Sequence, residues 1–320
     1  GPTVTIDRTG PTVTINQAVG QADPTNVSPI HFTAVFSEPV SGFTGADVTL
    51  SSGTATVTPV SATIFDVSVT GMVQGVLTAS TPAGGVTDDV GIVNVASTST
   101  DNSVLYDTLV PTVTVNQEVT QPDPTNTSPI NFTVVFSEPV TGFTSADVVP
   151  SGTAAPTTAI VTSGSGTTYN VTVSGMAADG TVILTVPAGG AQDVTGNSNA
   201  ASTSTDNIVT YDTTRPTVTI NQAAAQPDPT NVSPINFTVV FSEPVTGFTD
   251  TDITLTGTAG PTTAVVTGSG TTYNVAVSGM TGSGTVTAFV LVNAGQDAAS
   301  NSSFASTSVD NTVTFDNSVP

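Results

Sequence analysis

The chain has 320 residues, with 24 acidic side chains against two basic ones, so its formal net charge at pH 7 is −22. This charge excludes the basic surface with which proteins bind nucleic acid or an anionic membrane. Cysteine and tryptophan are absent and histidine occurs once, which excludes disulfides, zinc sites and repeated Ser-His-Asp triads. No apolar stretch is long enough to span a bilayer.

One set of motifs occurs three times along the chain. The string Pro-Thr-Val-Thr-Ile/Val-Asn-Gln begins at Pro11, Pro111 and Pro216, and Asp-Pro-Thr-Asn, Phe-Ser-Glu-Pro-Val and Gly-Met follow it in the same order. Such self-similarity indicates tandem copies of one domain. We expect a tail of a preceding repeat or a linker strand at 1–10, repeats at 11–107, 108–212 and 213–316, and the start of a further linker at 317–320.

Within a repeat, apolar and polar residues alternate. In the second repeat Ile130, Phe132, Val134 and Phe136 alternate with polar residues or Val135, the pattern of a half-buried strand. The strands expected in the second repeat are 112–117, 129–137, 145–150, 156–162, 168–174, 181–187 and 205–211. About seven short strands in roughly 100 residues are typical of a Greek-key sandwich. We therefore predict an all-β protein with three tandem immunoglobulin-like β-sandwich domains in an extended rod.

Three motifs carry a family resemblance over residues 11–320. They are the opening Pro-Thr-Val-Thr-Ile, the Phe-Ser-Glu-Pro-Val-Thr-Gly-Phe-Thr block at 136–144 and 241–249, and the Pro-Ala-Gly-Gly…Asp…Gly-Asn block at 187–197. With these motifs the chain resembles the bacterial immunoglobulin-like (Big-type) domains repeated through large surface proteins and adhesins. The first repeat departs from the third motif at 88–92. The resemblance implies a spacer or adhesive role at the cell surface, often with a dependence on calcium.

The acidic residues recur at fixed places. Six positions in each repeat hold an acid in all three copies. In a seven-strand sandwich the linker, the B–C loop and the F–G loop lie at one pole, so we expect four carboxylates to meet at each junction. The candidate metal ligands are Asp7, Glu38, Asp47 and Asp88 at the first junction, Asp107, Glu138, Asp147 and Asp193 at the second, and Asp212, Glu243, Asp252 and Asp297 at the third.

Four carboxylates without lysine or arginine beside them repel one another strongly. A hard divalent cation relieves that repulsion, and Ca²⁺ accepts 6–8 oxygen ligands in flexible geometry. We therefore expect Ca²⁺ at the domain junctions. The alternative is that these acids cap turns and keep the rod in solution.

Several functions fit this sequence. The first is a non-enzymatic extracellular region, rigidified by Ca²⁺, that serves as the stalk of a surface adhesin or as the building block of a cell-surface filament. Its partners would be neighbouring repeats or subunits and a cell-surface or matrix ligand, with no nucleic acid and no membrane insertion. The alternative is a ligand- or carbohydrate-binding adhesion module that uses the loops between strands. We expect no enzymatic activity and no catalytic residue.

Overall fold

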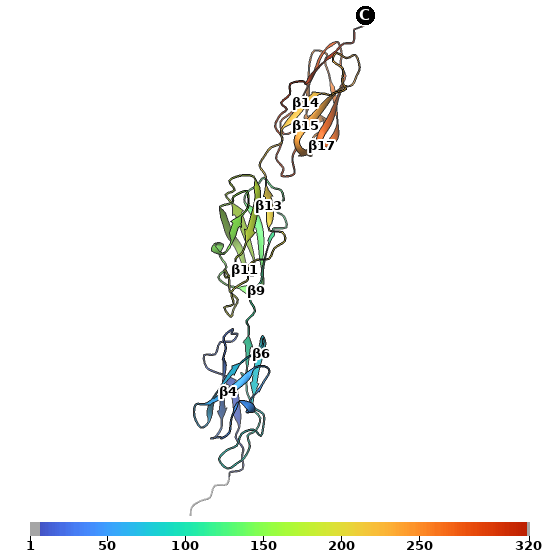
Figure 1. Ribbon diagram of the computed structural model, residues 1–320. Coiled ribbons are helices and arrows are strands. Elements are labelled where there is room, and N and C mark those ends of the chain that lie inside the picture. The colour runs from blue at the N-terminus through green and yellow to red at the C-terminus, as the bar shows by residue number, and fades with distance from the viewer. Residues whose placement is uncertain (1–6, 319–320) are drawn as a thin grey trace, which may run out of the picture.

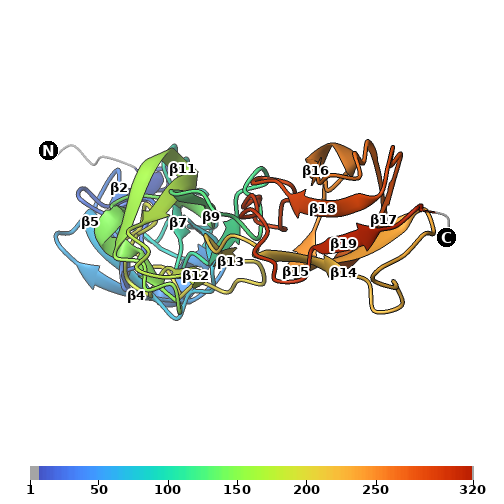
Figure 2. The same ribbon diagram turned by 90° about the horizontal axis from the view of Figure 1, so that it is seen from above.

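The computed structural model describes residues 7–318, so most of the predicted N-terminal tail and the last two residues lie outside the described part. Three β-sandwiches follow one another in a row, and the chain runs through them from one end to the other (Figure 1). Seen along the row, the third sandwich leans away from the first two (Figure 2). No helix among residues 7–318 is long and apolar enough to cross a membrane.

Each repeat contributes six or seven strands and one short 3₁₀ turn. The second repeat contains β8 (Val113–Gln117), β9 (Ile130–Val140), η2 (Ser145–Asp147), β10 (Val149–Ser151), β11 (Thr158–Ser174), β12 (Gly180–Thr185) and β13 (Ile208–Tyr211). The first repeat contains β1 (Val13–Gln17), β2 (Ile30–Phe36), η1 (Gly45–Asp47), β3 (Thr49–Leu50), β4 (Thr54–Pro59), β5 (Ile64–Thr70), β6 (Gly75–Ser80) and β7 (Ser103–Tyr106). The third contains β14 (Val218–Gln222), β15 (Ile235–Val245), η3 (Asp250–Asp252), β16 (Ile253–Thr256), β17 (Thr263–Ser278), β18 (Gly284–Val290) and β19 (Thr312–Phe315).

The strands pair as two antiparallel sheets in every repeat. In the first repeat the order is β1-β2-β5-β4 in one sheet and β3-β6-β7 in the other. With the seven strands lettered A to G in chain order, these sheets are ABED and CFG. This is the arrangement of a constant-type immunoglobulin sandwich, so the predicted fold class is confirmed.

Three strand boundaries differ from the prediction. The segment expected as strand C begins with the 3₁₀ turn η2, and only β10 pairs in the sheet. The segments expected as D and E form one continuous run, β11, which bends at Gly164 and Gly166, two glycines with positive φ. Strand B is longer than expected, because β9 continues to Val140 and takes in Glu138.

The core of each repeat follows from the alternation in its strands. In β9, Ile130, Phe132, Val134 and Phe136 are each at most 2% exposed, as predicted. Three separate hydrophobic clusters form, one within each repeat. Each contains a triad of rings packed edge to face, with centroids 4.9–5.9 Å apart, an arrangement that adds to the stabilisation from burial.

Two of the triads end in a tyrosine whose hydroxyl is buried. The Tyr273 hydroxyl donates to the Val245 carbonyl at 3.0 Å, and Tyr169 donates to Val140 at 3.3 Å. The first repeat has Phe65 at this place. We predict that Tyr273→Phe lowers the free energy of unfolding of the third repeat by about 0.5–1.5 kcal/mol, because the ring stays and only the hydrogen bond is lost. Hydrogen exchange read by mass spectrometry would measure this, since its peptides report on single repeats. Unchanged protection in the third repeat would contradict the prediction.

Candidate metal centre

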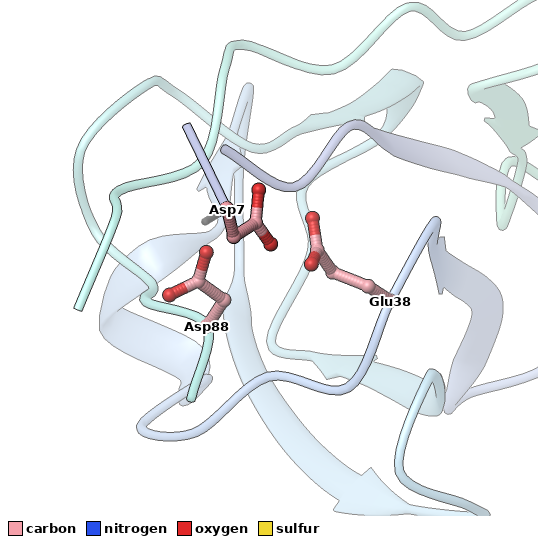
Figure 3. Close-up of side chains that lie close together, drawn as sticks. All are labelled: Asp7, Glu38 and Asp88. Atoms are coloured by element: carbon pink, nitrogen blue, oxygen red, sulfur yellow. The ribbon is translucent and has the colours of Figure 1, made fainter. Parts of the chain in front are cut away.

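Three groups of carboxylates gather in the described part of the chain. In each group, one carboxylate oxygen per residue lies within 4.8 Å of the others. We name them cluster 1 (Asp7, Glu38, Asp88), cluster 2 (Asp107, Glu138, Asp193) and cluster 3 (Asp212, Glu243, Asp297). In cluster 1 the three side chains come from different segments and turn their carboxylates toward one another (Figure 3).

Different elements supply the three members of cluster 2. Asp107 follows β7 in the linker, Glu138 lies within β9, and Asp193 lies in the F–G connection between β12 and β13. Glu138 and its counterpart Glu243 were expected in the B–C loop and instead sit near the ends of strands. A strand fixes the backbone of these glutamates, whereas the two aspartates are held by their own turns.

The linker aspartates share one local structure. An Oδ1 atom accepts a hydrogen bond from the backbone N–H two residues later, from Thr9 to Asp7, from Leu109 to Asp107 and from Thr214 to Asp212. Such a turn is a common use of aspartate at a bend. It fixes the carboxylate in orientation.

The F–G aspartates are buried, and their turns hold them. Asp193 is 4% exposed, and its Oδ1 accepts from the backbone N–H groups of Thr195 and Asn197 at 2.8 and 2.9 Å. Asp88 Oδ1 accepts from the backbone N–H groups of Val90 and Ile92, and Asp297 Oδ1 accepts from that of Asn301. The three F–G aspartates therefore hold equivalent places although the sequence of the first repeat differs at 88–92.

An asparagine joins cluster 2 to the preceding repeat. The Asn197 side-chain amide donates to Asp193 Oδ2 at 2.9 Å and to the Asp107 carbonyl at 3.0 Å, while its Oδ1 accepts from Asn26 Nδ2 at 3.0 Å. Asn26 belongs to the first repeat, so this bond crosses the junction. Cluster 3 has the same contacts through Asn301 and Asn126.

Neither asparagine pair was predicted. The only sequence signals were the repeated Asp-Pro-Thr-Asn string, which contains Asn26 and Asn126, and the change to Ile92 in the first repeat. The aspartate of that string holds the A–B loop in place, since Asp23 Oδ1 accepts from the Leu105 N–H at 2.9 Å. This loop reaches the linker too, where the Asp107 N–H donates to the Thr25 carbonyl.

The fourth acid predicted at each junction lies outside the clusters. These residues are Asp47, Asp147 and Asp252. Asp147 instead caps η2, where its Oδ2 accepts from the Thr144 N–H and hydroxyl, both at 2.8 Å. The other two do the same in η1 and η3. A Cβ on Gly190 would lie 2.7 Å from the Asp147 Cβ, so the glycine there makes room for this cap.

No protein cation neutralises the clusters within residues 7–318. The one ion pair in this part of the chain joins His31 to Asp66 at 3.0 Å. Arg215 is engaged elsewhere, because it donates to the carbonyls of Ser302 and Ser303 and stacks 4.3 Å from the centre of the Phe304 ring. The like charges at each junction therefore face one another without a counter-ion from the protein.

This environment separates the pKa values of the acids. Burial, followed by the charges of Asp193 and Asp107, raises the pKa of Glu138, and Glu243 is raised in the same way. Burial alone would also raise the pKa of Asp193, but hydrogen bonds from Thr195 and Asn197 lower it. Each cluster thus contains a glutamate that resists ionisation beside aspartates held in place by hydrogen bonds.

The donor set suits a hard divalent cation. Two oxygens bound to one Ca²⁺ at about 2.3–2.6 Å can lie at most about 5.2 Å apart. The carboxylate oxygens of each cluster fall within that limit. Carboxylate oxygens are preferred by Ca²⁺ and Mg²⁺, and softer metals prefer nitrogen or sulfur. The three residues of a cluster can therefore bind Ca²⁺, and other oxygen atoms can fill the remaining coordination positions of the ion.

The raised glutamate pKa values predict an unusual pH profile for the protein in EDTA. The folded chain binds protons at these glutamates more readily than the unfolded chain, so stability rises as pH falls from 7 toward about 4.3. Below about pH 3.9 stability falls again. The reason is that aspartates whose pKa values are lowered by hydrogen bonds become protonated and lose those hydrogen bonds. The groups concerned are Glu38, Glu138 and Glu243 for the rise, and Asp7, Asp179, Asp193 and Asp316 for the reversal. Melting temperatures across this range would check the prediction, and a steady fall from pH 7 downward would contradict it.

Comparison with known proteins identifies the repeat. Residues 107–210 match the bacterial Ig-like domain family Big_12, and no curated protein matches the chain. Among solved structures, FdeC, described as a broadly conserved Escherichia coli adhesin, is 14% identical and aligns over 93% of this chain and 96% of its own with a TM-score of 0.32. A TM-score this low carries no structural argument. The second repeat thus matches the bacterial Ig-like domain family, and the first and third repeats have the same strand order.

Proposed function

We propose that this chain is a non-catalytic spacer of a bacterial surface protein, made rigid by Ca²⁺ at the junctions between its repeats. The spacer is either the stalk of an adhesin or a building block of a cell-surface filament. The observation that carries the proposal is the position of the clusters. Each includes a linker aspartate together with two acids of the repeat that follows.

The junctions connect metal binding to mechanics. A cation bound to cluster 2 would tie Asp107 in the linker to Glu138 and Asp193 in the second sandwich. The bridge from Asn197 to Asn26 already reaches the preceding sandwich from the same loop. Restraining the linker at both ends would reduce bending between repeats, which is what a stalk requires.

The other functions gain less support. The second and third B–C blocks, 136–144 and 241–249, are identical in sequence, whereas loops that recognise different ligands would be expected to differ. Paired carboxylates do occur in glycoside hydrolases, but here the same three carboxylates recur at three junctions. We therefore propose no catalytic role for any residue.

A calcium titration followed by calorimetry tests the proposal. Only the folded chain gathers the ligands, so saturating Ca²⁺ should stabilise each repeat, by about 2.7 kcal/mol at 100 times the dissociation constant. Glu138→Gln should remove this gain in the second repeat. In EDTA the same variant should melt higher than the wild type, because it removes one of the repelling charges.

Glu118→Gln is the matched control, since it removes a charge from the same repeat at a half-buried place outside the clusters, where Glu118 accepts hydrogen bonds from Thr120. This control should keep the full response to Ca²⁺. Melting curves that coincide in Ca²⁺ and in EDTA would exclude the calcium part of the proposal. If both variants lost the same amount of stabilisation by Ca²⁺, the net charge of the chain and not the cluster would control the response.

A further inference from the structure

Cluster 1 differs from the other two clusters in the residue that stands four places after its F–G aspartate. Asn197 and Asn301 each stand four residues after the F–G aspartate, and the first repeat has Ile92 there. The backbone of the loop is the same, since the Ile92 N–H donates to Asp88 Oδ1 at 2.9 Å just as the Asn197 N–H donates to Asp193. Only the side-chain amide is missing in the first repeat.

This change leaves a buried carboxylate oxygen without a partner. The amides of Asn197 and Asn301 donate to the Oδ2 atoms of Asp193 and Asp297, both at 2.9 Å. Asp88 is 5% exposed, and its Oδ2 accepts no hydrogen bond from residues 7–318. A buried carboxylate oxygen without a hydrogen-bond donor is costly. The Asp88 carboxylate faces Asp7 across cluster 1 (Figure 3).

Cluster 1 also carries more uncompensated charge than the others. A second aspartate, Asp89, directly follows Asp88, whereas Val194 and Ala298 stand at this place in the other two repeats. The neighbouring Arg8 is exposed, and it forms no ion pair with the cluster in the described part of the chain. The extra acid and the unpartnered oxygen are independent features of the same site.

We propose that the three junctions bind divalent cations with unequal affinity, and that cluster 1 is the tightest. This inference rests on the proposed function. An oxygen that already accepts an amide hydrogen bond has one lone-pair direction occupied and offers less charge to a metal. Asp88 Oδ2 has both lone-pair directions free, and no hydrogen bond reduces the charge that it offers. The difference corresponds to about one charge-assisted hydrogen bond, and we expect affinity about tenfold tighter at cluster 1.

The junctions would therefore be stabilised by different groups. At clusters 2 and 3 the asparagine stabilises the metal-free state and holds the preceding repeat through Asn26 or Asn126. At cluster 1 the cation alone supplies the missing partner. As Ca²⁺ rises, cluster 1 fills first and the two inner junctions fill later.

Isothermal titration of Ca²⁺ into the full chain tests this inference with three double variants, each of which leaves one cluster intact. Glu138→Gln with Glu243→Gln leaves cluster 1, Glu38→Gln with Glu243→Gln leaves cluster 2, and Glu38→Gln with Glu138→Gln leaves cluster 3. The expected result is a dissociation constant about tenfold lower for cluster 1. Adding Ile92→Asn to the variant that retains cluster 1 should raise its dissociation constant to that of the others. Ile92→Leu, which adds no amide, should leave it unchanged.

The outcomes separate the two ideas. Equal constants for the three clusters, or a weaker cluster 1, would overturn the ranking while leaving calcium binding in place. Calcium binding by none of the variants or the wild type would overturn both the ranking and the proposed calcium dependence. If Ile92→Asn alters folding, as judged by circular dichroism, the three double variants still decide the ranking.

Discussion

The constraint on which the structure depends is the meeting of three carboxylates at each junction without a protein cation beside them. Strand geometry brings them together: B returns to the pole from which A departs, and the F–G connection returns to it again. With oxygens of three residues within 4.8 Å of one another, the folded chain concentrates charge that the unfolded chain disperses. Burial raises the pKa of Glu138, and the charges of Asp193 and Asp107 raise it further. The sandwich core, which is apolar and confined to each repeat, must offset it when no metal is bound.

The same residues that repel one another also connect neighbouring repeats. Asp107 is tied on one side to the first sandwich, because its N–H donates to Thr25 and its Oδ1 accepts from Gln74. On the other side it lies beside Glu138 and Asp193. The Asn26–Asn197 bridge runs parallel to this path. A cation would add a third connection at the same place, so bending of the rod and occupancy of the clusters are expected to vary together.

Much of the fold could be predicted from the sequence, because period-2 alternation places Ile130 and Phe136 on one face whatever the rest of the chain does. The joining of strands D and E could not be predicted. A bend within one strand at Gly164 and Gly166 and a turn between two strands have the same sequence pattern and differ only in backbone geometry. Of the four acids predicted at each junction, three gather in a cluster. The predicted topology places Asp147 at the same pole as the other three. An aspartate three residues after Thr144 looks the same in the sequence whether it binds a metal or caps a turn. The Asn26–Asn197 bridge depends on how two domains sit, which periodicity within one domain does not determine.

If divalent cations at the clusters restrict motion between repeats, the distribution of distances across one junction should change when Ca²⁺ binds. The chain contains no cysteine, so spin labels on Ser61→Cys and Ser165→Cys would report only on the first and second repeats, at exposed positions near the D–E turns. We expect a broad distribution of distances in EDTA that narrows in Ca²⁺, and no narrowing when Glu138→Gln is added. A distribution of the same width with and without Ca²⁺ in the wild type would contradict this expectation.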